Sequence, residues 1–330
     1  MKESKKVILG VMKKNIARDD KFENLVLNLA LRKMNGAGKD DNGVYYSKGQ
    51  KHLVMASKTL EGEYTVKEGT ESIEDNAFWG CAFVTKIIIP EGVKTIGDEA
   101  FGRCLSLKEV TVPASVEKMG HNPFVGLDAD AVKCQSEAYP VDAKIMYNAD
   151  HTRLVACLTD AALVIIPRSV TEISDFAFAR RRSLRKVVIP EGVTHIGADA
   201  FCDCDALEEV SIPSTVTDID AYAFSDCDAL RRVVFAGEVK HIHRTAFADC
   251  DLLKEVSVPA DTAARFRKQL RMAAESEMYI VEREDAKAAK PAAKPAEEAA
   301  AAPVTEPEKA KEEAAPAAEP AKKQKADKKK

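Results

Sequence analysis

Apolar residues recur along this chain at a fixed interval of 23 residues. The dipeptide Ala-Phe, with a cysteine three residues after the phenylalanine, begins at Ala200, Ala223 and Ala246. Aligned on the aromatic residue, seven units share one frame, with Phe78, Phe101, Phe124, Phe178, Phe201, Phe224 and Phe247. Self-similarity at this interval predicts a solenoid of stacked structural repeats, in which each unit contacts its neighbours.

Each unit contains one segment in which polar and apolar residues alternate. In the segment 107–113, Val110 and Val112 point to the interior together with Leu107, whereas the polar residues between them face solvent. Pro113 ends this strand, because proline has no N–H to donate to a sheet. A second apolar set lies in the returning segment, for example Val93, Ile96, Ala100 and Phe101. One unit cannot bury both sets, so neighbouring units must stack.

The repeat resembles that of the BspA-like, Treponema-type leucine-rich repeat family, with the pattern I-x-x-x-A-F-x-x-C-x-x-L-x-x-V-x-I-P-x-x-V-x-x-I. The resemblance covers about residues 43 to 282. It implies a β-rich α/β solenoid of leucine-rich repeats, with short parallel strands on one face and helical caps at its ends. It also implies a binding scaffold, and the ligands of such scaffolds vary from member to member.

Two interruptions of the pattern define the predicted organisation. A hairpin pattern surrounds the Lys48-Gly49 turn, and the same layout returns in residues 143–157. This second hairpin lies between Phe124 and Phe178, whose separation of 54 residues is two repeat periods plus eight residues. Residues 20–35 read as an amphipathic helix. We expect an N-terminal helical cap (1–42), a hairpin and first repeat block (43–127), an irregular insertion with a hairpin (128–162), a second block (163–259), a C-terminal helix–strand cap (260–285) and a disordered tail (286–330).

Charge separates this tail from the body. Residues 286–330 contain 11 Lys and 8 acidic residues, a formal charge of +3. Since the net charge of the whole chain is −4, the rest of the chain carries −7. The Ala, Lys, Pro and Glu of the tail cannot bury a core. Because residues 1–285 carry a net negative charge, we do not expect them to bind polyanions. The lysine-rich end keeps nucleic-acid or ribosome association as an alternative function for the tail alone.

Five of the eight cysteines share one inward repeat position, Cys81, Cys104, Cys204, Cys227 and Cys250. We expect a reduced, buried column, because parallel stacked side chains suit the disulfide dihedral angle poorly, although the strand spacing alone does not exclude a bond. Cys202 and Cys204 have no second Cys or His pair, so no zinc site is predicted.

The Asp-Cys-Asp phrase predicts two stacks of carboxylates, Asp203 with Asp226 and Asp249, and Asp205 with Asp228 and Asp251. Aspartate is a natural turn former, whereas calcium is the alternative reason for such a stack. Arg180 and Arg182 occupy the two positions in the preceding unit, so we expect arginine to offset each stack and no metal to be required.

The outward positions of the strands provide the candidate interaction surface. Charges alternate in sign there from strand to strand, as in Lys186, Glu209, Arg232 and Glu255. Opposite charges on neighbouring strands balance each other, which disfavours nucleic-acid binding. The next outward position carries β-branched and small polar residues, which suit strands by propensity alone or form a strip for a protein partner. The residues of this candidate surface are Ile88, Thr111, Ile165, Val188, Ser211, Val234 and Ser257.

No motif places catalytic residues, a cofactor or a metal. Gly36-Ala37-Gly38-Lys39 lacks the rest of a phosphate loop, and the six histidines are scattered along the sequence. We therefore predict a non-enzymatic, monomeric scaffold that binds a protein or glycan through its strand face or its hairpin insertion. The chain has no apolar stretch long enough for a signal peptide or a membrane span, which favours the cytoplasm. A surface adhesin exported by an unrecognised route is the alternative.

Overall fold

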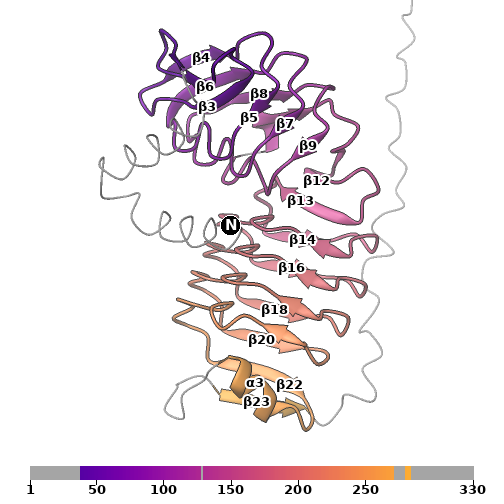
Figure 1. Ribbon diagram of the computed structural model, residues 1–330. Helices are drawn as coiled ribbons and strands as arrows, with labels where there is room; N and C mark the ends of the chain where they lie inside the picture. Colours follow the sequence, from indigo (N-terminus) through magenta and orange to yellow (C-terminus); the bar gives the residue numbers. More distant parts are fainter. Residues whose placement is uncertain (1–37, 128, 271–278, 284–330) are drawn as a thin grey trace, which may run out of the picture. The chain divides into compact units, whose positions relative to one another are not determined.

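The computed structural model of the chain describes residues 38–127, 129–270 and 279–283, all within one compact unit, Met1–Lys287 (Figure 1). The predicted helix at 20–35 and the tail at 286–330 lie outside the described residues. None of the described helices is long and apolar enough to cross a membrane.

The alternating segments form the predicted parallel strands, one per turn of a solenoid with a period of 23 residues. In the first block these strands pair in the order β10-β8-β6-β4, and in the second in the order β14-β16-β18-β20-β22-β23 (Figure 1). We call their outer surface the long-strand face. The strands are β4 (Glu61–Thr65), β6 (Phe83–Ile88), β8 (Glu109–Val112), β10 (Val132–Cys134), β14 (Leu163–Ile165), β16 (Lys186–Val188), β18 (Glu209–Ile212), β20 (Arg232–Phe235), β22 (Glu255–Pro259) and β23 (Tyr279–Arg283).

Each turn also contributes a second, two-residue strand from the V-x-x-I segment. Together with the antiparallel strands at the start of each block, these short strands form two further sheets, ordered β1-β2-β3-β5-β7-β9 and β11-β12-β13-β15-β17-β19-β21. Their outer surface, with the residue before and the two residues after each strand, is called the short-strand face. The strands are β1 (Gly38–Lys39), β2 (Tyr45–Tyr46), β3 (His52–Met55), β5 (Ser72–Ile73), β7 (Thr95–Ile96), β9 (Lys118–Met119), β11 (Val141–Asp142), β12 (Ile145–Tyr147), β13 (Arg153–Cys157), β15 (Glu172–Ile173), β17 (His195–Ile196), β19 (Asp218–Ile219) and β21 (His241–Ile242).

Both predicted hairpins are present and have the same design. Strand β2 is antiparallel to β3, and β12 is antiparallel to β13, each with a register shift in the pair. Each hairpin then starts a parallel ladder, with Leu53 opposite Ile73 in the first block and Leu154 opposite Ile173 in the second. The insertion is therefore the start of a second hairpin-led block. A 3-10 turn, η1 (Ala129–Ala131), precedes it.

The interior consists of columns of identical side chains. Phe178, Phe201 and Phe224 are fully buried and stack with ring centroids 4.7 Å and 4.9 Å apart. All eight cysteines are free thiols, which confirms the reduced column. Its thiols donate to the backbone of the preceding turn, for example Cys204 Sγ to the carbonyl of Phe178 at 3.2 Å, which satisfies both polar groups inside the core.

The junction between the blocks lacks this regularity. In the second block, the backbone N–H of Phe201 donates to the carbonyl of Ala223 in the next turn at 2.7 Å. At the junction, the N–H of Phe124 is instead bonded to the Asn122 side chain, whose Nδ2 donates to the Phe176 carbonyl at 2.7 Å. Arg181 replaces the column cysteine, is 3% exposed, and donates to the Leu127 carbonyl at 2.9 Å. Side-chain bonds thus join the two blocks where the backbone ladder is interrupted.

A helix and a strand follow the last repeat, as predicted. Helix α3 (Ala263–Gln269) buries Phe266 against Phe235, with ring centroids 4.7 Å apart. Strand β23 adds to β22 in parallel from Tyr279 opposite Glu255 to Arg283 opposite Pro259. These two elements cover the apolar end of the long-strand sheet in the second block.

Candidate functional site

The long-strand face carries most of the predicted interaction surface. Ile88 is 40% exposed, Ile165 is 59% exposed and Val188 is 39% exposed. Ser211 is exposed, and Thr111 and Val234 are half-buried. In the second block Ile165 lies opposite Val188, and Ser211 opposite Val234, on neighbouring parallel strands. These side chains therefore form rows across the strands, and the exposed Leu163 extends the apolar part.

Ser257 does not belong to this exposed surface, contrary to our expectation. It lies opposite Val234 in register, but it is 1% exposed. The side chain of Arg283 reaches from β23 across β22 to the carbonyl of Phe235 in β20. Val281 of β23 lies opposite Ser257, so the added strand flanks this position. The strand itself was predicted as part of the C-terminal cap, but its pairing beside Ser257 was not, because β23 lies beyond the last repeat.

Alternating charges flank the apolar rows, as predicted. Lys86 Nζ and Lys133 Nζ each lie 3.0 Å from the Glu109 carboxylate. In the second block Arg232 Nε lies 2.8 Å from Glu255, and Arg232 Nη1 lies 3.9 Å from Glu209. Hydrogen bonds from the two lysines hold the pKa of Glu109 below its usual value. This arrangement neutralises itself, so the flanks of the surface have no strong preference for one sign of charge.

Two hollows on the described part of the molecule lie near the long-strand sheets. One, of about 370 Å³, is next to the insertion, and the other, of about 340 Å³, is at the end of the second long-strand sheet. The first is lined by Leu107, Lys108, Asp130, Ala131, Lys144, Leu158, Thr159 and Asp160. The second is lined by Arg231, Arg232, Leu252, Lys254, Glu255 and Tyr279. Both combine charged rims with a few apolar side chains, which suits contact with a macromolecular surface.

The carboxylate stacks are offset by arginine at one end, as expected. Arg180 Nη1 lies 3.1 Å from Asp203, and Arg182 Nε lies 3.3 Å from Asp205. The first stack occupies a left-handed backbone position, with φ of 58° at Asp203 and 55° at Asp226. Burial, followed by the charges of Asp203 and Asp249, raises the pKa of Asp226. The stack therefore has a local electrostatic cost that arginine relieves only at its first member.

One group of potential cation ligands in the described ranges includes this stack. A Cys202, an Asp203 and an Asp226 ligand atom lie within 4.8 Å of one another. Asp203 already has the Arg180 guanidinium as its counter-ion. The geometry is compatible with a cation, but the ion pair gives a sufficient reason for the arrangement.

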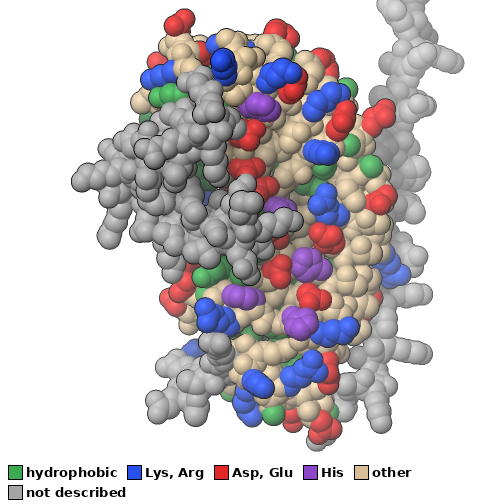
Figure 2. Space-filling model, in the orientation of Figure 1, with side chains coloured by type: hydrophobic (Ala, Val, Ile, Leu, Met, Phe, Trp, Pro, Cys, Tyr) green, Lys and Arg blue, Asp and Glu red, His purple; other side chains and the backbone are tan. Residues whose placement is uncertain are grey.

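Sequence reasoning missed the short-strand face, where the fold brings the histidines together. Figure 2 shows histidine side chains distributed along one face among acidic residues. His52, His195 and His241 lie in short strands, His121 and His243 lie within two residues after β9 and β21, and His151 lies in the turn between β12 and β13. For His195, His241 and His243 the available signal was their position directly before or after the isoleucine of a V-x-x-I segment, which becomes visible when the repeats are aligned.

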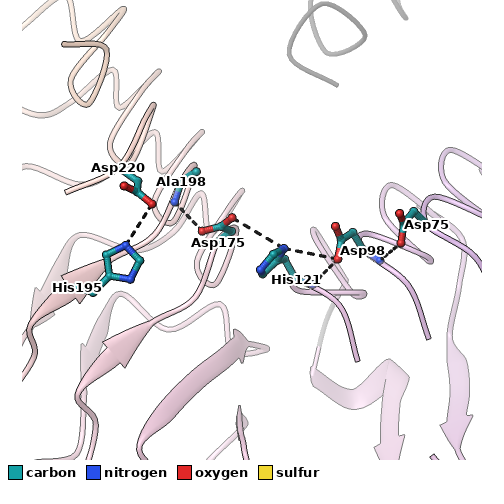
Figure 3. A network of polar contacts seen from close by, with 7 residues as sticks. All are labelled: Asp75, Asp98, His121, Asp175, His195, Ala198 and Asp220. Carbon is teal, nitrogen blue, oxygen red and sulfur yellow. Dashed lines mark hydrogen bonds and ion pairs between the residues drawn. The ribbon is translucent and has the colours of Figure 1, made fainter. Parts of the chain in front are cut away.

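Carboxylates accompany four of these histidines. His195 Nε2 lies 3.1 Å from Asp220 Oδ2, and His121 Nδ1 lies 3.5 Å from Asp98 and 3.8 Å from Asp175 (Figure 3). The corresponding Nδ1 distances are 3.6 Å from His52 to Glu74 and 3.5 Å from His151 to Asp142. Hydrogen bonds with Asp220 and Asp98 raise the pKa of His195 and of His121, respectively, against the opposing effect of burial.

His121 has a special place in this network because it joins the two blocks. Asp98 belongs to the same block as His121, and Asp175 belongs to the next (Figure 3). Asp75 and Asp98 each accept the backbone N–H of the residue one turn later, Asp98 and His121, at 2.9 Å and 2.8 Å. Asp175 accepts the N–H of Ala198 at 2.8 Å in the same way. Two of these bonds lie in the first block and one lies at the start of the second, with His121 between them.

Comparisons with solved structures agree with this architecture. A leucine rich cell surface protein from Faecalibacterium prausnitzii has 21% sequence identity and a TM-score of 0.51, with 64% of this chain and 62% of that chain covered. A leucine-rich repeat protein from Eubacterium ventriosum has 23% identity and a TM-score of 0.51, with 62% and 63% covered. The chain thus spans less than two thirds of either protein, and this similarity supports the fold alone. A search of curated proteins gives no significant match.

The family model of the BspA type leucine rich repeat region matches residues 62–151 and 157–269, with six copies of the repeat. These ranges include both long-strand sheets except β23 and the first residue of β4, and both V-x-x-I ladders. Of the hairpin that leads the second block they include β12, but only the last residue of β13. The match extends over more than half of the chain, so the chain belongs to the BspA-type leucine-rich repeat family.

Proposed function

We propose that this chain is a non-enzymatic binding scaffold that holds an extended protein segment on its long-strand face. The observation that carries this proposal is the row of outward apolar side chains between columns of alternating charge. A glycan is the alternative ligand. The proposed contact surface consists of Ile88, Thr111, Ile165, Val188, Ser211 and Val234, with Ser257 removed because it is buried.

The spacing of the strands supports an extended ligand. Neighbouring parallel strands are about 4.8 Å apart, so the outward side chains form a narrow strip that runs across the sheet. Burial of such apolar surface contributes about 25 cal/mol per Å². The flanking ion pairs, such as Arg232 with Glu255, offer both donors and acceptors. A polypeptide with apolar side chains and both signs of charge matches this chemistry better than a polyanion does.

Site-specific crosslinking in the native cell tests the proposal. A photo-crosslinking residue at Val188 on the long-strand face should capture a defined partner. The same residue at Thr194, exposed on the short-strand face, serves as the matched control. Ile165→Glu should remove the capture at Val188 without changing the folding of the scaffold, because Ile165 is 59% exposed. Equal capture from both faces, or no effect of Ile165→Glu, would contradict the proposal.

We also propose that the scaffold acts as a monomer at the cell surface, with the cytoplasm as the alternative location. The F. prausnitzii neighbour is described as a cell surface protein, which supports the proposed surface location. Protease shaving of intact cells should degrade a surface-located chain and spare a cytoplasmic marker. Light scattering of the purified chain tests its oligomeric state, and a dimer mass would contradict the monomer.

The lysine-rich tail allows a second function, association with nucleic acid or ribosomes. Deletion of residues 286–330 should leave the Val188 crosslink intact if the long-strand face binds the partner. Loss of the crosslink in the deletion, together with loss of RNA binding, would favour the tail instead.

A further inference from the structure

Two neighbouring strands on the short-strand face present a rectangle of two carboxylates and two imidazoles. Asp218 lies opposite His241, and Ile219 lies opposite Ile242, in the parallel pair β19 and β21. The ladder continues beyond the paired residues, because the N–H of His243 donates to the Ile219 carbonyl at 2.9 Å. Ile219 and Ile242 are 1% and 7% exposed, so the residues that flank them point outward. Asp220 and His243 therefore form the second pair of the rectangle.

The dimensions of the rectangle suit a single metal ion. Residues two apart on a strand are about 6.6 Å apart, and neighbouring strands are about 4.8 Å apart. Imidazole nitrogens and carboxylate oxygens bind zinc at about 2.0–2.2 Å. Side chains from these four positions can therefore reach one ion centred above the sheet. Two histidines with two carboxylates favour zinc, copper or nickel over calcium and magnesium, which prefer oxygen ligands.

Neighbouring contacts already hold part of this set in place. His243 Nδ1 lies 2.8 Å from Thr245 Oγ1, and an Nδ1–H that donates to this hydroxyl leaves the Nε2 lone pair for a metal. Asp220 Oδ2 is anchored by His195 Nε2 at 3.1 Å.

The histidines have room to turn toward an ion. Both His241 and His243 are exposed, and β21 is the last strand in the order of its sheet within the described residues. As the side chains stand, no three ligand atoms of this set lie within 4.8 Å of one another. Binding therefore requires rotation of exposed side chains, while the backbone register stays as it is.

We propose that Asp218, Asp220, His241 and His243 bind one divalent transition-metal ion, with zinc as the test ion. This site is separate from the long-strand face and does not depend on the proposed partner. His52, His121 and His151 each have a nearby carboxylate but no second histidine two residues away. They provide the matched controls.

Calorimetric titration of Zn²⁺ into the full chain, purified without a polyhistidine tag, tests the site. Wild type should bind one Zn²⁺ per chain. His241→Ala with His243→Ala should weaken binding by at least about tenfold. His52→Ala with His151→Ala removes the same number of histidines elsewhere in the chain and should leave the affinity within about twofold of wild type. Equal weakening in both double variants, or no saturable site in wild type, would overturn the proposal.

Electron paramagnetic resonance of Cu²⁺ bound to wild type gives a readout that needs no variant. The spectrum should show hyperfine coupling to two imidazole nitrogens. Coupling to one nitrogen or to none would overturn the proposal even if the His241→Ala and His243→Ala chain failed to fold. Circular dichroism of each double variant shows whether the repeat fold is retained.

Discussion

The hairpin of β2 and β3 leads the first repeat block, and the hairpin of β12 and β13 leads the second in the same manner. In both blocks a buried phenylalanine column follows, with ring centroids 5.5 Å apart between Phe78 and Phe101 and 4.7 Å apart between Phe178 and Phe201. Their short-strand faces differ. The first block pairs Lys94 with Glu117 at 2.7 Å, whereas the second carries threonines that bond to the backbone of the previous turn, as Thr194 Oγ1 does to the Thr171 carbonyl at 3.2 Å.

This comparison shows which positions the repeat constrains. An inward side chain contacts its equivalents in both neighbouring turns, so a change in one turn leaves a void or a clash in the others. An outward side chain meets only its lateral neighbours and solvent. The interior is therefore copied from block to block, and the surface is where the blocks acquire separate properties. The junction is the exception, because polar side chains replace the columns there.

Removal of a column ring should have the largest effect. Phe201→Ala and Phe101→Ala each delete a fully buried ring between two others, which should cost about 3–5 kcal/mol of unfolding free energy. Urea unfolding monitored by circular dichroism measures the loss. Because contacts in a solenoid are local, each variant should lower the transition of its own block most. A single, equally shifted transition in both variants would show that the two blocks unfold as one.

Substitution of Arg181 by the column residue tests the junction. Arg181→Cys restores the repeat pattern but leaves the Leu127 carbonyl without its donor, which should cost about 1–3 kcal/mol. The unfolding transitions of the two blocks should also separate further. Cys204→Ala, inside the second block, is the control and should not separate them. Stabilisation by Arg181→Cys would mean that the buried charge costs more than its hydrogen bond contributes.

His121 should make the junction more stable in mild acid. Asp98 and Asp175 face its ring and favour the protonated form, whereas Arg153 opposes it, and the pKa in the folded chain is raised. The stabilisation is fully present below the unfolded pKa of about 6.5 and is lost as the pH rises through the folded pKa. His121→Gln should lower the melting temperature more at pH 5.5 than at pH 8.5. The extra loss of unfolding free energy should be less than about 1 kcal/mol, because the side chain is half exposed. An equal loss at both pH values would contradict this.

The smallest expected effect concerns the aspartate stack. The raised folded pKa of Asp226 means that its ionised form destabilises the fold at neutral pH. Asp226→Asn should raise the unfolding free energy at pH 7 by a few tenths of a kcal/mol, roughly the size of an exposed pair interaction. The gain should vanish below about pH 3.8, where the unfolded group is protonated. Asp203→Asn, which loses the Arg180 ion pair, should change stability in the opposite direction.

The repeat frame could be predicted because its periodic apolar positions are local in sequence and identical in role. It gave the buried columns, the parallel strands, both hairpins and the Arg180–Asp203 pair correctly. The exposure of Ile165 and Val188 followed from the same alternation. The exposure of Ser257 was predicted wrongly, because β23, which pairs with β22 at this position, comes from beyond the repeats.

The sequence by itself thus determined the turn of the solenoid, since a period of 23 residues leaves one way to bury its two apolar sets. Only the tertiary structure decided which surface side chains of neighbouring turns lie next to each other. It placed His121 beside Asp175 of the next block, and His241 and His243 beside Asp218 and Asp220. The physical reason is that parallel stacking fixes the register between residues a full turn apart. Residues scattered in sequence become neighbours on a face only when that register is formed.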